Sequence, residues 1–356
     1  MGSFLDKPVT EKEHGGGPWS GNGMDVALSS MQGWRVDQED AHVVEVSVSG
    51  HKELGWFGVF DGHGGSLVSG ESAKRLLGKF SLEDKSVDAL SASIHDGFLA
   101  LDKELHQLSQ VQRGEDHSGS TAITCMVTPT HFICGNTGDS RAILIRDGRS
   151  VAMSDDHKPY NPRELARIQA AGGTVTMRRV NGDLAVSRAL GDFVYKTNTS
   201  MKDVEQQVSA EPEMRTFERN EATDQYIVLA CDGIWDVMSN DEVAEYVLDT
   251  TARGCTDLTL LCDSLIDECL ARSSRDNMSV VLIQFKAAPK PSAAAVERFQ
   301  RIQMASAGAG EGAAGGDEGA GGGAGEEGSA GGAAEGGAGE EGGDAAAAVA
   351  ASSTGT

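Results

Sequence analysis

Aspartates beside short apolar runs are the feature that most constrains the fold of this chain. The first example is Trp56–Phe60, an apolar run that ends at Asp61 and continues into a glycine-rich turn. An apolar run bounded by turn residues predicts a buried strand, so Asp61 should lie where the chain leaves a sheet. Gly62 lets the backbone bend tightly and approach a ligand closely. Carboxylates at strand ends can hold a hard cation, although a single Asp-Gly turn is common and indicates little alone.

Three further aspartates occupy comparable positions. Asp139 and Asp232 each follow an apolar run, and Asp276 precedes the apolar run Ser279–Ile283. One or two of these residues could simply terminate strands. Four of them, at the ends of four predicted core strands, favour a common site.

Charge and cysteine content narrow the class of protein. The 356 residues carry a formal net charge of −24, and the segment after Arg301 holds nine acidic residues and no Lys or Arg, which leaves −15 for the rest. An acidic body argues against nucleic-acid partners. The six cysteines show no C-x-x-C spacing and are predicted to be buried free thiols in a reducing compartment. No apolar run is long enough for a transmembrane helix, and the first residues do not resemble a secretory signal.

Periodicity predicts an α+β protein. Apolar residues at helical spacing predict helices over 66–77 and 87–108, after Asn161 and Asn240, and from about Thr256. Runs with strand patterns recur between them, often joined by short turns such as Asp147-Gly148, and 193–208 should be an irregular flap. Crossover βαβ units are scarce. We therefore expect two packed antiparallel β-sheets flanked by α-helices, an αββα sandwich.

The acidic residues indicate a particular chemistry. The candidates are Glu39, Asp40, Asp61, Asp139, Asp232, Asp236 and Asp276. Carboxylates gathered without cationic partners need a cation to neutralise them. Oxygen ligands suit Mg²⁺ or Mn²⁺, and the lack of a Cys/His cluster disfavours zinc. Two such ions about 3.5–4 Å apart can bridge a water and present it as hydroxide for attack on phosphorus. Arg35 could hold the phosphate oxygens, and His63 could protonate the leaving alkoxide.

An ordered set of short motifs identifies the family that this chain resembles. The motifs are Ser29–Arg35 with Glu39–His42, Phe60–Gly65, Ser118–Ala122, Gly138–Arg141, Asp156–Pro159, Leu184–Asp192, Ala230–Asp236 and Ser274–Ser279. Their order and content resemble the metal-dependent Ser/Thr protein phosphatases of type 2C, the PPM class. The resemblance covers Met1 to about Lys290, roughly four-fifths of the chain. Each motif is weak alone, whereas the ordered set is highly specific.

The resemblance implies a role for each candidate. Asp61 would bridge two Mg²⁺ or Mn²⁺ ions, Asp232 and Asp276 would complete one ion's ligands, and the Gly62 carbonyl would help to hold the other. Glu39 and Asp40 would act mostly through ordered waters, and Asp139 with Asp236 could support a weaker third ion. Arg35 would grip the phosphate, His63 would be the general acid, and Arg179 would contact substrate beyond the phosphate. The family fold is the same sandwich of antiparallel sheets and helices.

The resemblance also suggests boundaries and partners. We expect an N-terminal arm over 1–22, a type 2C phosphatase catalytic domain over 23–288, a short helical extension over 289–305 and a disordered Gly/Ala/Glu-rich acidic tail over 306–356. The N-terminus resembles that of relatives acylated at Gly2, although Asp6 departs from the myristoylation pattern. We therefore expect a monomer that acts on phosphoserine and phosphothreonine proteins, in the cytoplasm or nucleus, with membrane contact if Gly2 is acylated. The relatives' helical C-terminal domain is replaced here by the tail.

Two other classes stay open at this point. A pseudophosphatase would bind phosphoproteins without turnover, but it should lack a metal aspartate or Arg35, and all of them are present. A phosphatase of small phosphorylated metabolites is not excluded, because specificity lies in the flap and the surface loops.

Overall fold

The computed structural model describes residues 4–311, and these residues contain two large antiparallel sheets. The first sheet has the strand order β1-β3-β17-β16-β10-β11, with β2 paired to β3. Its strands are β1 (Phe4–Glu13), β2 (Trp19–Gly21), β3 (Met24–Arg35), β10 (Arg141–Arg146), β11 (Arg149–Ala152), β16 (Asp224–Ala230) and β17 (Met278–Phe285). The second sheet has the order β15-β9-β8-β5-β4. Its strands are β4 (Ala41–Glu45), β5 (Gly55–Phe60), β8 (Ala122–Val127), β9 (His131–Thr137) and β15 (Glu213–Glu218).

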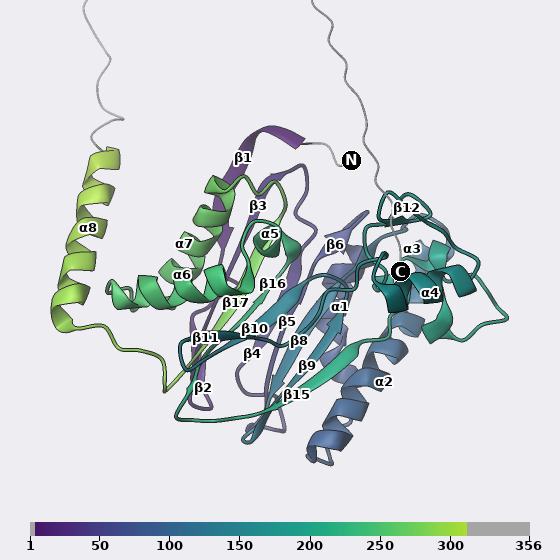
Figure 1. Cartoon of the computed structure of the whole chain (residues 1–356), viewed down its shortest axis with the longest axis horizontal. Helices are drawn as coiled ribbons and strands as arrows, with labels where there is room; N and C mark the ends of the chain where they lie inside the picture. Colours follow the sequence, from purple (N-terminus) through teal and green to yellow (C-terminus); the bar gives the residue numbers. More distant parts are fainter. Residues whose placement is uncertain (1–3, 312–356) are drawn as a thin grey trace, which may run out of the picture. The chain divides into compact units, whose positions relative to one another are not determined.

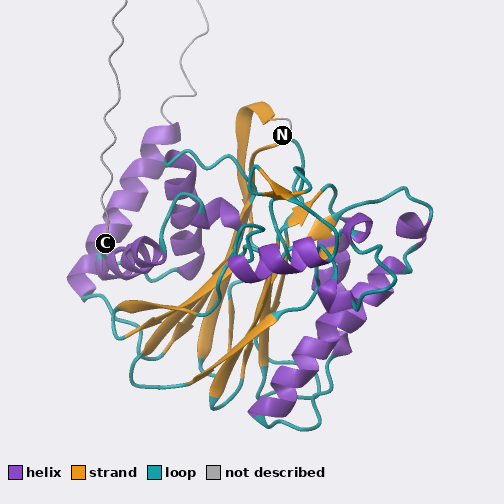
Figure 2. Ribbon diagram, turned by 45° about the vertical axis from the view of Figure 1, so that its right-hand side comes forward, coloured by secondary structure: helices purple, strands orange, loops and turns teal. Residues whose placement is uncertain are grey.

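Helices cover the outer faces of both sheets, which confirms the predicted αββα sandwich (Figures 1 and 2). The helices α5 (Asp232–Trp235), α6 (Asn240–Ala252) and α7 (Leu258–Ala271) pack on the first sheet. The helices α1 (Leu67–Arg75) and α2 (Val87–His106) pack on the second sheet. A third apolar cluster, which includes Phe57, Ile123 and Val281, fills the space between the two sheets. This arrangement follows from alternation, because successive residues of the inner strands pack against the other sheet and against helices.

Two smaller sheets shape the end of the sandwich where the site lies. One contains β6 (Gly62–His63), β7 (Gly119–Ser120) and β14 (Leu190–Gly191), and the other is the hairpin of β12 (Val175–Thr176) and β13 (Arg179–Val180). The predicted flap, 193–208, has little regular structure beyond the two 3₁₀ turns η2 (Phe193–Tyr195) and η3 (Asp203–Glu205). The remaining described helices are α3 (Ser109–Gln112), α4 (Pro162–Ala170) and α8 (Ala293–Glu311), with a 3₁₀ turn η1 (Leu77–Lys79) after α1.

Several local expectations need correction. The arm expected over residues 1–22 contributes an edge strand, because β1 pairs with β3. Asn161 stands at the start of α4, but its side chain donates to the Asp156 carbonyl at 2.8 Å and does not cap the helix.

Helix α8 is also longer than expected. It continues to Glu311, past the predicted end at 305. The rest of the tail, 312–356, lies outside the described residues.

Other expectations are confirmed. All six cysteines are buried free thiols. The Asp147-Gly148 turn joins β10 to β11, with both residues at positive φ as this type of hairpin requires. Of the helices that the structure describes, none combines the length and the apolar character needed to span a bilayer.

Candidate active site

A cavity of about 390 Å³ opens at one end of the sandwich and gathers most of the predicted site residues. It is lined by Arg35, Asp61, Gly62, His63, Thr121, Asp139, Lys158, Arg179, Leu184, Ala185, Val186, Asp232, Asp236 and Asp276. Of the residues that the sequence analysis selected, Glu39 and Asp40 alone do not line the cavity.

Antiparallel pairing explains why distant aspartates meet here. Strand β5 ends one residue before Asp61, and β16 ends two residues before Asp232. Strand β17 begins two residues after Asp276 and runs antiparallel to β16, with Ala230 opposite Val280. The end of β16 therefore lies beside the start of β17. At Gly62 a Cβ atom would overlap the backbone of Glu39, so the close approach of these two segments requires glycine.

The carboxylates of Asp61 and Asp232 form no ion pair with a cationic side chain of the described residues. Burial, and then the charge of the surrounding aspartates, raises the pKa of Asp61 and of Asp232 well above the usual range. Burial also raises the pKa of Asp236. These shifts mean that ionising all of these carboxylates together costs free energy unless a cation binds between them. Their donor set, carboxylate and backbone oxygen, fits a hard divalent cation.

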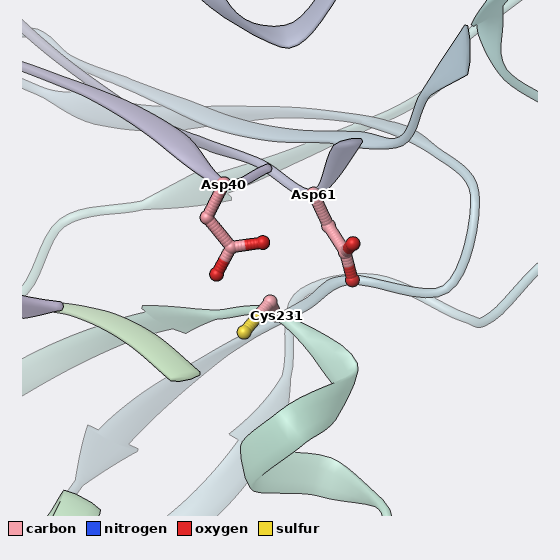
Figure 3. A group of neighbouring side chains, drawn as sticks. All are labelled: Asp40, Asp61 and Cys231. Carbon is pink, nitrogen blue, oxygen red and sulfur yellow. The ribbon is translucent and has the colours of Figure 1, made fainter. Parts of the chain in front are cut away.

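Asp40 lies beside Asp61, just behind the cavity lining. Figure 3 shows both carboxylates approaching the same space, with Cys231 on the other side. A ligand atom from each of these three residues lies within 4.8 Å of the other two. The Oδ2 atom of Asp40 accepts a hydrogen bond from Ser279 at 2.6 Å, whereas its Oδ1 atom is buried with no partner in the described part of the chain. Burial raises the pKa of Asp40 to about 6, so this orphan oxygen also calls for a cation or a water bound to one.

Cys231 and Glu39 differ from Asp40 in their surroundings. Burial raises the pKa of the Cys231 thiol well above its usual range, so it stays protonated and is a poor ligand for a hard ion. Glu39 accepts a hydrogen bond from the backbone N–H of Gly65 at 2.6 Å, and its own carbonyl accepts one from Ser69. The carboxylate of Glu39 is thus held by the turn that follows Asp61, and Glu39 does not line the cavity.

Arg35 supplies positive charge at the edge of the cluster. It is the last residue of β3, and its Nη2 atom donates to Oδ2 of Asp276 at 2.6 Å. Its Nε atom is buried and has no hydrogen-bond partner among the described residues. A buried guanidinium N–H without a partner costs free energy unless a ligand accepts from it. The site therefore offers a free donor that an anion such as phosphate could use.

His63 is held by a residue to which the sequence analysis gave no role. Its Nε2 atom lies 2.7 Å from Oδ2 of Asp192, a carboxylate that is 5 % exposed. The small sheet β14-β7-β6 brings the two together, and a Cβ atom at Gly119 would overlap both side chains. Burial by itself lowers the pKa of His63, but the charge and the hydrogen bond of Asp192 outweigh it and raise the pKa. Asp192 ends a motif that carried the family resemblance, which was the available signal.

Lys158 is a second residue without an assigned role. Its Nζ atom lies 2.5 Å from Oδ2 of Asp139, which is buried. This ion pair neutralises Asp139, unlike Asp61 or Asp232. Asp236, the residue expected to act with Asp139, is exposed at the rim. Any ion held by Asp139 and Asp236 must therefore compete with Lys158.

A sandwich with a carboxylate cluster at one end, beside a free arginine donor and a paired histidine, has the features of a metal-dependent hydrolase of phosphate esters. The family model described as protein phosphatase 2C matches residues 24–278. The chain belongs to the protein phosphatase 2C family, and it is a metal-dependent protein-serine/threonine phosphatase.

Similar proteins agree with this assignment. The chain is 47 % identical over 312 residues to "Protein phosphatase 1B" of Rattus norvegicus, a match that covers 84 % of this chain and 79 % of the relative. It is 46 % identical over 311 residues to "Protein phosphatase 1A" of Bos taurus, covering 85 % and 81 % of the two chains. Among solved structures, a phosphatase from a pathogenic strain of Toxoplasma gondii superposes with a TM-score of 0.65 at 27 % identity. That match covers 79 % of this chain and 94 % of the other. The predicted family and fold class are confirmed.

Proposed function

We propose that this phosphatase hydrolyses phosphoserine and phosphothreonine in proteins at the cavity between Asp61, Asp232 and Arg35. The observation that carries the proposal is the combination of carboxylates with raised pKa values and a buried guanidinium N–H that lacks an acceptor. The carboxylates need cations to neutralise them, and the guanidinium N–H needs an anion to accept its hydrogen bond. A phosphate ester bound with divalent cations satisfies both at once.

The ligands for the cations come from the strand-end residues. Asp61 would be shared by two Mg²⁺ or Mn²⁺ ions, with Asp232 and Asp276 on one side and the Gly62 carbonyl on the other. Glu39 and Asp40 would support the ions from behind the cavity lining through waters, and Asp139 with Asp236 would hold a weaker third ion. Ions held there would neutralise the carboxylates and would lower the pKa of a bound water, so that this water could attack phosphorus at neutral pH.

Arg35 positions the phosphate. Its guanidinium is always charged and can donate two parallel hydrogen bonds to phosphate oxygens. In the structure one of its nitrogens is engaged by Asp276, which holds the side chain at the cavity while Nε remains free to donate. Arg179, which lines the same cavity from β13, would contact the substrate beyond the phosphate.

His63 would donate a proton to the serine or threonine oxygen as the P–O bond breaks. This role requires the protonated imidazolium, and Asp192 favours that form because it raises the pKa of His63. The hydrogen bond at 2.7 Å also fixes the orientation of the ring. Asp192 therefore acts as a positioning residue for the general acid.

Phosphate release from a phosphothreonine peptide, with Mg²⁺ or Mn²⁺ or with excess chelator, tests this proposal. We expect turnover with either metal, loss of turnover in chelator, and recovery when metal is restored. Full activity in chelator would contradict the metal assignment. Peptide binding without turnover would indicate a pseudophosphatase, and a strong preference for small phosphorylated metabolites over all peptides would indicate the other class of substrate.

A further inference from the structure

The turn of the hairpin β12–β13 holds two side chains in a backbone conformation that they rarely adopt. Thr176 pairs with Arg179, which leaves Met177 and Arg178 as the two turn residues. Their φ values are 51° and 64°, where glycine or asparagine is preferred. Met177 is 88 % exposed, so packing of its side chain does not explain its presence. Strain of this kind in an exposed turn is typical of ligand-contacting segments.

The guanidinium of Arg178 lies over a partly exposed aromatic ring. Its guanidinium carbon is 3.9 Å from the ring centroid of Tyr160, which is 40 % exposed. A guanidinium that stacks through its face keeps the N–H groups along its edge available for a carboxylate or phosphate. Neither side chain makes a hydrogen bond or ion pair with any described residue. The stack therefore presents a pre-oriented donor edge to solvent.

Two further arginines close to these residues in the sequence form no ion pair with any described residue. Arg163, three residues after Tyr160, is exposed and makes no ion pair among the described residues. Arg179 donates at 2.6 Å only to a backbone carbonyl, that of Asp183, whose carboxylate pairs with none of these arginines. A chain of net charge −24 has ample acid to neutralise three arginines, so their free state on this surface favours an acidic partner from outside.

The stack lies within reach of a bound phosphopeptide. Arg179 lines the catalytic cavity, and Arg178 is its neighbour in the chain, so their Cα atoms are about 3.8 Å apart. An extended peptide advances about 3.3–3.6 Å per residue. A residue a few positions from the phosphoresidue would therefore reach the turn. Figure 1 shows β12 next to α4, the helix that begins just after Tyr160.

We propose that Tyr160, Arg163 and Arg178 form a specificity subsite for an acidic side chain that lies a few residues from the phosphoresidue of the substrate. Aspartate, glutamate and a second phosphoresidue share the required chemistry, an anion with two or more acceptor oxygens. This inference rests on the proposed function, because it assumes that a phosphopeptide occupies the cavity.

The test compares kcat/KM for phosphothreonine peptides that differ only in their flanking residues: neutral, acidic, doubly phosphorylated or lysine-containing. We expect the wild type to prefer the acidic and doubly phosphorylated peptides, and to lose this preference as ionic strength rises. Arg178→Gln should lower kcat/KM for the acidic peptide about three- to tenfold, as for a partly exposed charge-assisted pair, and leave the neutral peptide almost unchanged. Arg178→Lys should restore only part of the preference, because lysine cannot stack or donate in a planar fork.

Three further variants separate the role of the stack from a general loss of positive charge. Tyr160→Phe should keep the preference and Tyr160→Leu should weaken it, since the ring face is what orients Arg178. Arg149→Gln removes an exposed, unpaired arginine from β11, outside the cavity, and should have no effect on selectivity. Hydrolysis of p-nitrophenyl phosphate, which has no flanking residues, should be the same in the wild type and all five variants.

The outcomes distinguish this inference from the proposed function. Wild-type turnover without any acidic preference, or an equal loss on acidic and neutral peptides in Arg178→Gln, would overturn the subsite and leave the proposed function intact. Absence of phosphate release by the wild type from every peptide and from p-nitrophenyl phosphate would overturn the proposed function itself.

Discussion

Carboxylates at the cavity and in the first turn of α4 have pKa values that are shifted in opposite directions. Asp61 and Asp232 are partly buried, and burial with neighbouring aspartates raises their pKa well above the usual range. Glu164 on α4 is only 2 % exposed, so burial opposes its ionisation as well. Yet hydrogen bonds and charge from Arg188 and Arg167 lower the pKa of Glu164 to about 2.

The difference lies in the partners. Glu164 accepts hydrogen bonds from Arg188 Nη2 at 2.8 Å, Arg167 Nη1 at 2.6 Å and Ser187 Oγ at 2.8 Å, so its charge is satisfied inside the fold. Asp61 and Asp232 have no such partners, and their charge must be satisfied by something that binds. A paired buried carboxylate therefore indicates a structural role, and an unpaired cluster indicates a ligand site.

The largest expected effect tests the unpaired cluster. Asp61→Asn or Asp232→Asn should weaken metal binding and lower turnover by about 10³–10⁵-fold, because cation charge is worth several kcal/mol in the transition state. In chelator the melting temperature should stay the same or rise, since one repelling charge is removed. Metal titration by calorimetry and thermal unfolding measure the two effects. A variant with a lower melting temperature and unchanged metal affinity would show that the aspartate has a structural role, and it would contradict the distinction between paired and unpaired carboxylates.

A second prediction concerns His63, which lines the cavity and is paired with Asp192. His63→Gln should slow phosphopeptide hydrolysis by about 10²–10⁴-fold if His63 is the general acid. It should slow p-nitrophenyl phosphate hydrolysis much less, because nitrophenolate leaves without a proton. Metal affinity should hardly change, since the assigned ligands are oxygens. Equal losses on both substrates, or a matching loss of metal affinity, would remove His63 from the catalytic residues.

Substitution of the paired carboxylate Glu164 should lower stability and leave metal affinity unchanged, the reverse of what we expect for Asp61. Because the pKa of Glu164 is lower in the folded than in the unfolded protein, its stabilisation is present above about pH 4.5 and is lost as pH falls through about 2. Glu164→Gln should therefore lower the free energy of unfolding at pH 7 by about 3 kcal/mol, and the difference from wild type should shrink in acid. Denaturant unfolding across pH measures this. Metal affinity should be unchanged, which makes Glu164→Gln the matched control for Asp61→Asn.

The smallest effect is expected for carboxylates that composition predicts to be solvated. Removal of residues after Glu311 deletes eight acidic residues from a segment of almost only Gly, Ala and acid. Such a segment lacks the apolar side chains needed to form a core, so we expect no change in melting temperature or in turnover of p-nitrophenyl phosphate. A marked change in the melting temperature or in turnover would show that these acidic residues interact with the rest of the protein, as Glu164 does.

Much of the sandwich could be predicted because strand and helix periodicity is a local property. The helix α2, predicted over 87–108, spans Val87–His106, and the aspartates predicted at strand ends lie there. Errors occurred where local signals were weak. The edge strand β1 is stabilised by pairing with β3, and the end of α8 has no apolar pattern.

The sequence by itself determined the family, the layers and most of the residues that line the cavity, because each of these is encoded in short contiguous motifs. Only the tertiary structure decided which of those residues are paired. His63 meets Asp192 across 129 positions of the chain through the register of β6, β7 and β14. Arg178 meets Tyr160 through the placement of a hairpin turn against the start of α4. Side-chain partners across such separations follow from sheet register and packing, which no local pattern specifies.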